Sequence, residues 1–308
     1  MSRNLATLIG FSAILQWSSI VGLLKKISFV IGADLAVLFM YSFSALLLVL
    51  LFRIPDIRKI PRLYLMVGCV LFLVYELCFS YAIAFAQTAQ QAIEVSLVNY
   101  LWPSLTVAML ILFRELKFNH FVILGLLISF SGIVYIQTGN GTFDWHKMLN
   151  NMQSNPLSYI LALIGASLWA VYCVITRKYS AGHNPIALFF IAITVVLWGK
   201  MWLLHPEQLT QMPSLDLSTL GYMLLVSVVT GLGYAAWNIG INQGNITFLV
   251  TLSYFSPIFS SLLSMWILHT QLSSTFWQGA LMVTLGSFVC WISTNWSILK
   301  AKCTALIS

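Results

Sequence analysis

The chain has 308 residues, of which 60% are hydrophobic and only 7% are charged, and its mean hydropathy is +0.91. A soluble domain carries about 25% charged residues, so this composition excludes one and indicates an integral membrane protein. The net charge of +7 comes from 15 Lys and Arg in short clusters between apolar runs, which excludes the basic stripe of a nucleic-acid-binding protein.

Ten apolar segments are long enough to cross a hydrocarbon core of about 30 Å, which needs roughly 20 helical residues. They span residues 5–24, 33–52, 63–86, 92–113, 119–136, 157–176, 186–204, 217–241, 246–268 and 274–297. The first segment follows a short polar start without a small-residue cleavage site, so we expect a retained helix and not a signal peptide. The sequence predicts an all-α membrane protein with ten transmembrane helices.

A polar connection at residues 137–156, rich in Gly and Asn, divides these segments into two groups of five. We expect a first five-helix repeat at residues 1–136, this linker, a second repeat at 157–297 and a cytoplasmic tail at 298–308. Five is odd, so the second group enters the membrane in the opposite orientation. The two groups then form inverted repeats.

The repeats are visible in the sequence at a shift of 154 residues. This shift sets Asn-Tyr-Leu-Trp-Pro at 99–103 over Ser-Tyr-Phe-Ser-Pro at 253–257. It also matches two pairs of glycines, Gly125 with Gly279 and Gly132 with Gly286. A shift of 152 matches Trp17 with Trp169 in the first helix of each group.

Pro103 and Pro257 occupy equivalent positions inside predicted helices. Proline has no N–H and clashes with the carbonyl four residues earlier, so the two prolines free the carbonyls of Asn99 and Ser253. Matched helix breaks indicate a transport site near the middle of the membrane, where irregular backbone can line a cavity. We expect both prolines to be gating kinks.

The distribution of Lys and Arg predicts the orientation. With the N-terminus inside, eleven basic residues lie on the inner side and four, Lys25, Lys26, Lys147 and Lys200, lie on the outer side. The positive-inside rule therefore places both termini in the cytoplasm.

Glu76 and Glu94 are the only charged residues between positions 63 and 113. A carboxylate without a basic partner inside a membrane normally faces a cavity and marks a substrate or proton route. Both are candidates for proton coupling. The alternatives are structural: Glu94 could stabilise the start of its helix through the helix dipole, and Glu76 could bond to backbone carbonyls or water.

Aromatic residues make up 14% of the chain, and several lie on the segments that also carry polar residues. Single Trp and Tyr residues are usually anchors at the membrane surface. Tyr100 and Trp102, however, adjoin Pro103, and Trp237 is followed by Asn238 well inside its segment. These positions predict a central cavity that takes planar solutes by stacking and cations through the ring faces.

No catalytic or metal-binding pattern accompanies these features. The five cysteines have no CxxC spacing, and the five histidines fall in or beside predicted loops. Motifs of metalloproteases, serine hydrolases and nucleotide-binding loops do not occur. We expect no cofactor, no metal and no enzymatic activity.

Five runs give the chain a recognisable pattern: Gln-Ala-Ile-Glu at 91–94, Asn-Tyr-Leu-Trp-Pro-Ser-Leu-Thr at 99–106, Gly-Tyr-Ala-Ala-Trp-Asn-Ile-Gly at 233–240, Ser-Tyr-Phe-Ser-Pro at 253–257 and Trp-Gln-Gly-Ala-Leu-Met-Val at 277–283. Together they resemble the EamA-type bacterial aromatic amino acid exporters of the drug/metabolite transporter superfamily. The resemblance implies an inner-membrane protein with helices around a central cavity, exporting aromatic amino acids and some planar drugs. The cavity positions it implies are Trp17, Tyr75, Tyr81, Tyr100, Trp102 and Trp169, together with Glu76 and Glu94.

The resulting hypothesis is an exporter that works by alternating access and is able to act as a monomer among membrane lipids. Its predicted substrate-binding residues are Trp17, Tyr75, Glu76, Tyr81, Asn99, Tyr100, Trp102, Trp169, Trp237, Asn238 and Tyr254. The alternatives are a broad multidrug or metabolite exporter, an intramembrane enzyme and a sensor.

Overall fold

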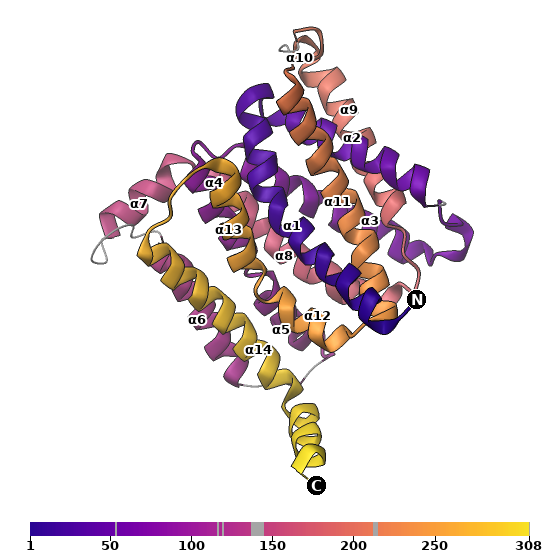
Figure 1. The fold of residues 1–308 in the computed structure, drawn as a ribbon, viewed down its shortest axis with the longest axis vertical. Coiled ribbons are helices and arrows are strands. Elements are labelled where there is room, and N and C mark those ends of the chain that lie inside the picture. The colour runs from indigo at the N-terminus through magenta and orange to yellow at the C-terminus, as the bar shows by residue number, and fades with distance from the viewer. Residues whose placement is uncertain (53, 116, 119, 137–144, 212–214, 308) are drawn as a thin grey trace.

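A computed structural model of the chain describes residues 1–52, 54–115, 117–118, 120–136, 145–211 and 215–307, and all regular structure in these ranges is helical (Figure 1). The elements are α1 (Arg3–Ile31), α2 (Ala33–Leu51), η1 (Ile57–Lys59), α3 (Arg62–Ala84), α4 (Ala89–Asn99), α5 (Trp102–Leu112), α6 (His120–Ile136), α7 (Trp145–Ser154), α8 (Pro156–Tyr179), α9 (Ile186–Leu204), α10 (Pro206–Thr210), α11 (Leu217–Gln243), α12 (Ile246–Ser253), α13 (Ser256–Leu268) and α14 (Ser274–Ile307).

Eight helical stretches in the described chain are long and apolar enough to cross a membrane, and one of them, Ala89–Leu112, combines α4 and α5. Two further apolar helices, α6 and α13, are shorter. Together these ten stretches fall on the ten predicted segments. The all-α membrane class is confirmed, and the arrangement as ten spanning helices in two inverted repeats stays a prediction.

Two of the predicted helices are broken. α4 gives way to α5 around Tyr100, and α12 gives way to α13 around Tyr254. Pro103 and Pro257 lie in the first turn of the new helices and not in a helix interior. The expectation of a proline kink inside a continuous helix was therefore wrong in form, because proline is tolerated in a first turn, where its missing N–H would have no intrahelical acceptor.

Other element bounds also differ from prediction. α1 continues past Lys25 because the Nζ atom of this buried lysine donates to the carbonyl oxygens of Ala84 and Ala86 at the end of α3. These carbonyls lack intrahelical donors and lie at the negative end of the helix dipole, so they satisfy the ammonium group. The predicted linker contains α7, and the predicted tail continues α14 to Ile307.

α6 and α14 lie side by side, and glycines allow their backbones to meet (Figure 1). A methyl group built on Gly125 would lie 2.5 Å from the carbonyl oxygen of Gly286, and one on Gly132 would lie 2.6 Å from that of Gly279. Small residues permit such close packing in lipid. The shift of 154 residues converts each of these contacts into the other, as expected of a self-complementary two-fold interface.

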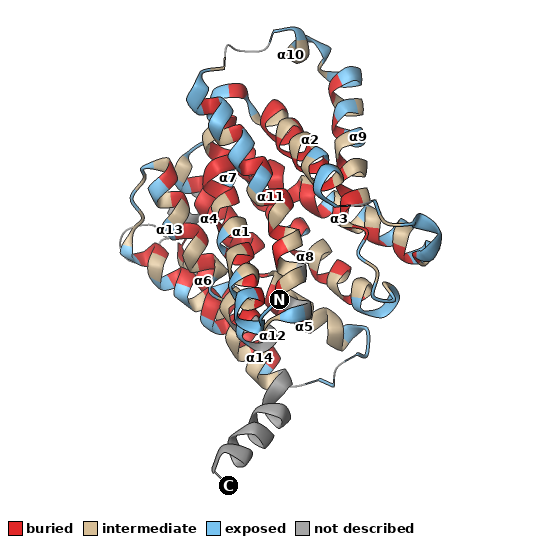
Figure 2. Cartoon of the chain, turned by 45° about the vertical axis from the view of Figure 1, so that its right-hand side comes forward, coloured by how far each residue is buried: buried red, intermediate tan, exposed pale blue. Residues whose placement is uncertain are grey.

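The packing of the central helices is also equivalent under the predicted repeat. α1 packs against α11, and α3 packs against α8. In the predicted repeat α1 corresponds to α8 and α11 to α3, so the two pairs are equivalent. Buried residues line the faces between these helices (Figure 2), whereas Leu203 and Trp266 are 82% and 74% exposed on outer faces, as suits contact with lipid.

Candidate functional site

Glu76 is buried on α3, and two tyrosines donate hydrogen bonds to its carboxylate. Tyr41 of α2 donates to Oε2 and Tyr234 of α11 donates to Oε1, each at 2.5 Å. The Tyr41 hydroxyl also lies 2.8 Å from the hydroxyl of Ser80, one turn along α3. A polar group inside a membrane must find protein partners, and this carboxylate finds them on two neighbouring helices. Glu76 therefore joins α2, α3 and α11.

Aromatic rings pack around Tyr234. Its ring centre lies 5.2 Å from that of Trp17, 5.7 Å from that of Phe72 and 5.6 Å from that of Phe190, in edge-on arrangements. Trp237, on the next turn of α11, lies 5.5 Å from Trp17. Edge-on and tilted contacts at these distances are favourable for aromatic pairs.

A second group of rings surrounds Trp169 of α8. Its centre lies 4.5 Å from that of Tyr75, 5.1 Å from that of Tyr172 and 6.3 Å from that of Trp102. Phe72 lies 6.2 Å from Trp169 and so connects this group to Tyr234.

These side chains form one continuous group, which we name the aromatic cluster: Trp17, Phe72, Tyr75, Trp102, Trp169, Tyr172, Phe190, Tyr234 and Trp237. Trp17, Trp102, Trp169 and Trp237 are only half-buried although they lie between helices. Other protein atoms therefore do not fully cover their rings. Five predicted residues, Trp17, Tyr75, Trp102, Trp169 and Trp237, belong to the cluster.

Asn99 ends α4 beside this cluster. The residue is 2% exposed, its side chain interacts with that of Tyr75, and its Oδ1 atom has no hydrogen-bond partner in the described part of the protein. Gly165 of α8 faces this oxygen, since a methyl group built there would lie 3.4 Å from it. Because Pro103 lacks an N–H, the backbone carbonyl of Asn99 also has no donor four residues later. Two acceptor oxygens thus lie at the helix break.

Tyr100 and Tyr254 mark the two helix breaks and are not joined to the aromatic cluster by a ring contact within the described residues. Tyr100 is 9% exposed and packs in a second hydrophobic core. Tyr254 packs against Phe288 and Trp291 of α14, with ring centres 6.3 Å away in both cases.

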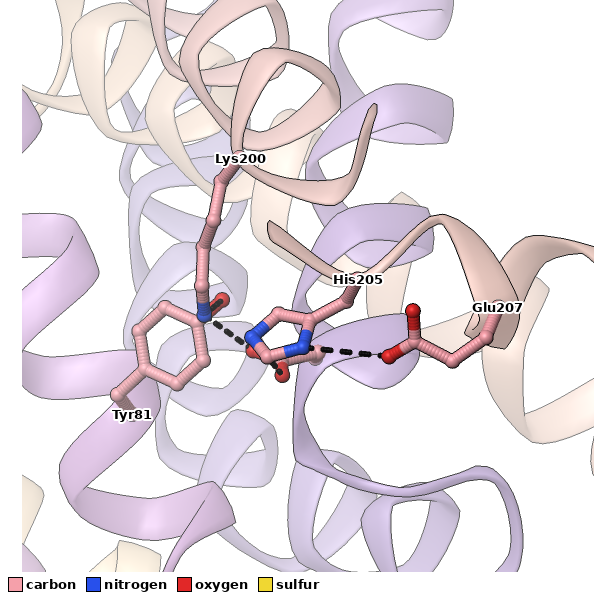
Figure 3. Close-up of polar contacts among 5 residues, drawn as sticks. Tyr81, Lys200, His205 and Glu207 are labelled. Atoms are coloured by element: carbon pink, nitrogen blue, oxygen red, sulfur yellow. Dashed lines mark hydrogen bonds and ion pairs between the residues drawn. The ribbon is translucent and has the colours of Figure 1, made fainter. Parts of the chain in front are cut away.

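Tyr81 was predicted to bind substrate in the central cavity, but it lies beside Lys200 instead. Its hydroxyl accepts a hydrogen bond of 3.0 Å from Lys200 Nζ, which also pairs with Asp34 (Figure 3). His205 lies 4.0 Å from Asp34 and 3.5 Å from Glu207. This ion-pair cluster joins the start of α2 to the end of α9. Beside it is a hollow of about 430 Å³, lined by Ile31, Gly32, Ala33, Asp34, Leu35, Phe85, Glu207, Gln208 and Gln211.

Glu94 has neighbours different from those of Glu76. Gln90 donates to its Oε1 at 2.7 Å and Tyr159 of α8 donates to its Oε2 at 3.3 Å. Glu94 is 5% exposed and lies beyond the first turn of α4, so the interpretation that it stabilises the helix start is wrong. The two acids do not form one site.

The predicted substrate-binding residues did not include Tyr41, Phe72, Tyr172, Phe190 and Tyr234. Glu76 and Ser80 are four residues apart and share a helix face, which signals a polar face on α3 but does not identify its partner. Tyr41 lies on a segment with no other conspicuous feature. The side chain of the predicted residue Asn238 lies outside what the structure describes. The described residues also contain no group of three or more His, Cys, Asp or Glu side chains that could hold a metal ion.

The second half of the chain matches a known family. Residues 156–292 match the EamA-like transporter family. This range begins at the first residue of α8 and extends into α14, so it coincides with the second group of five predicted segments.

Three curated relatives resemble nearly the whole chain, and each is named aromatic amino acid exporter YddG. The protein of Escherichia coli is 43% identical over 297 residues, and that of Salmonella typhimurium is 42% identical over 296 residues; each alignment covers 96% of this chain and 99% of the relative. The protein of Ancylobacter novellus is 26% identical, and its alignment covers 85% of this chain and 88% of the relative. One solved crystal structure has a TM-score of 0.65 at 23% identity, covering 96% of this chain and 99% of its own. The last similarity shows a shared fold.

Proposed function

The chain belongs to the EamA-like transporter family, and from that premise we propose that it exports aromatic amino acids across the bacterial inner membrane. Two relatives carry this activity in their names. They are 42% and 43% identical to this chain, and each alignment covers 99% of the relative. The chain is a multi-pass membrane transporter, and we propose that it catalyses no reaction and needs no metal or cofactor.

The aromatic cluster is the observation that supports the substrate class. Its rings come from α1, α3, α5, α8, α9 and α11, and thus from both predicted repeats. An indole or phenyl ring gains about 0.5–1.5 kcal/mol from a well-placed aromatic pair beyond the burial of its surface. Half-buried tryptophans between helices offer such pairs, whereas an aliphatic side chain would gain only from burial.

The same arrangement supports alternating access. Because the cluster lies between two groups of helices, a tilt of one group against the other would open it first to one side of the membrane and then to the other. The division at 1–136 and 157–297 is the one we propose for these groups. The excess of basic residues on one side supports cytoplasmic termini, and no part of the proposed path needs a second copy of the chain.

Proteoliposomes that contain the purified full-length protein test this function. Vesicles loaded with labelled phenylalanine should lose label faster than empty-membrane controls, and labelled leucine should leave more slowly. No flux of phenylalanine, tyrosine or tryptophan would contradict the proposal. Equal flux of aromatic amino acids and of planar organic cations would favour the broad drug exporter.

A further inference from the structure

We propose that Asn99 binds the α-ammonium group of the exported amino acid, an assignment that rests on the proposed function and adds the polar half of the binding site. The aromatic cluster accounts for recognition of a ring but not for recognition of the charged end of an amino acid. Glu76 is the obvious candidate by charge. Each of its carboxylate oxygens, however, already accepts a hydrogen bond from a tyrosine.

Asn99 has a side-chain acceptor with no hydrogen-bond partner in the described residues, whereas both carboxylate oxygens of Glu76 already have one. Its Oδ1 atom is buried in a residue only 2% exposed and has no partner in the described part of the protein. A buried polar atom without a hydrogen bond costs free energy, and the large majority of buried side-chain polar atoms have a partner. The Asn99 oxygen is therefore an acceptor that an N–H group of a ligand can satisfy.

The backbone around Asn99 favours a cation. α4 ends at this residue, so the negative end of its dipole and its last carbonyl groups are here. Pro103 has no N–H, so it offers no donor to the carbonyl oxygen of Asn99. Helix C-termini at breaks of this kind coordinate cations in other transporters.

Gly165 and Trp169 give the distance between the charge and the ring. Both lie on α8, four residues apart and hence on one face, about 6 Å apart along the helix axis. Gly165 places no side chain against the Asn99 oxygen, and Trp169 packs against Tyr75 and Trp102. An amino acid with its ammonium group over Gly165 can reach Trp169 with its ring.

Three ligands isolate the ammonium group: phenylalanine, 2-phenylethylamine, which lacks the carboxylate, and 3-phenylpropionate, which lacks the ammonium. We would measure the binding of each to the full-length protein in detergent. The wild type should bind phenylalanine about tenfold or more tightly than 3-phenylpropionate, which is the usual effect of a hydrogen bond to a charged group. Asn99→Ala should weaken phenylalanine and 2-phenylethylamine about tenfold and leave 3-phenylpropionate within twofold.

Gly165→Ala is a second variant with the same expectation. Its new methyl group would lie 3.4 Å from Asn99 Oδ1 and 3.5 Å from the Cβ atom of Cys78, which are ordinary contacts, so it should fold and yet occupy the ammonium position. It decides the question if Asn99→Ala does not fold. Ser253→Ala changes the equivalent residue at the other break, which already has a partner, and should not alter the ranking of the three ligands.

The outcomes separate this assignment from the proposed function. Wild-type protein that neither binds nor transports phenylalanine contradicts the function. Wild-type protein that binds it, together with Asn99 and Gly165 variants that keep its affinity or weaken all three ligands equally, overturns the assignment alone. Loss of phenylalanine binding when choline replaces sodium in the buffer would also overturn it, because an inorganic cation would then occupy these oxygens.

Discussion

Replacement of Glu76 by alanine should destabilise the protein much more than replacement by glutamine. The alanine variant removes both acceptor oxygens that hold Tyr41 and Tyr234. Glutamine keeps one acceptor oxygen and adds an amide N–H. Tyr234 can then donate to that oxygen, while Tyr41 accepts from the amide and donates to Ser80, which lies 2.8 Å away.

The contacts set the size of the difference. In Glu76→Ala the hydroxyl of Tyr234 loses the one acceptor described for it, which costs about 1–3 kcal/mol. Tyr41 keeps Ser80 and loses about 1 kcal/mol, so the total is about 2–4 kcal/mol before any cavity forms. In Glu76→Gln only the charge assistance of the two bonds is lost. Interhelical hydrogen bonds in membranes average about 0.6 kcal/mol, so a cost near 1 kcal/mol is expected.

Thermal unfolding of the two variants in detergent, followed by the loss of monodisperse protein, would show the order. The matched control is Ser80→Ala, which removes one partner of Tyr41 and leaves the carboxylate in place. Equal midpoints for the alanine and glutamine variants would refute the reasoning, since they would show that the tyrosine bonds contribute nothing. Flux through Glu76→Gln with and without a pH gradient tests proton coupling at the same time: a structural bridge predicts an unchanged response, and a lost response would assign Glu76 to a proton route.

Three further predictions follow from the packing. Gly286→Ala should lower the unfolding midpoint by the equivalent of about 1–3 kcal/mol, because its methyl group would lie 2.4 Å from a backbone carbonyl oxygen. The control Gly221→Ala meets nothing within 4 Å and should be neutral, and equal effects of the two variants would show that α6 and α14 can separate freely. Trp169→Ala should reduce the affinity for tryptophan several-fold more than that for leucine, and an equal loss in binding assays would indicate damage to the fold instead. The double variant Pro103→Ala, Pro257→Ala should slow flux in proteoliposomes while its thermal midpoint stays close to that of the wild type, because alanine lets each broken helix close; unchanged flux would remove the gating hypothesis.

The sequence predicted most of the scaffold because the scaffold follows local rules. Apolar segments of the sequence matched eight long helical stretches and the two shorter helices α6 and α13 of the described chain, and proline marked both helix breaks. Trp17 and Trp169 were found through the repeat and lie in the aromatic cluster. The form of the breaks was missed because a proline in a helical pattern does not show whether the helix bends or starts again one residue earlier.

The partners of Glu76 could not be predicted, since they depend on how separate helices pack. Nothing local connects Tyr41 or Tyr234 to a carboxylate on α3. The position of Tyr81 was open to prediction: six helical residues from Tyr75 turn a side chain by about 240° to another face. Tyr81 accordingly reaches Lys200, and Tyr75 reaches Trp169.

The two halves differ where the substrate is proposed to bind, and this difference has a physical reason. The shift that preserves the glycine contacts of α6 and α14 converts Asn99 to Ser253, Trp102 to Ser256 and Glu76 to Thr230. An amino acid has no two-fold symmetry, so one set of polar and aromatic partners is sufficient and a second set would compete with it. A symmetric scaffold gives the two halves equivalent ways to tilt, and the asymmetric side chains then decide how strongly each state holds the substrate. We therefore expect changes at the glycines to affect how α6 and α14 pack, and changes at Asn99 or in the aromatic cluster to affect which substrate binds.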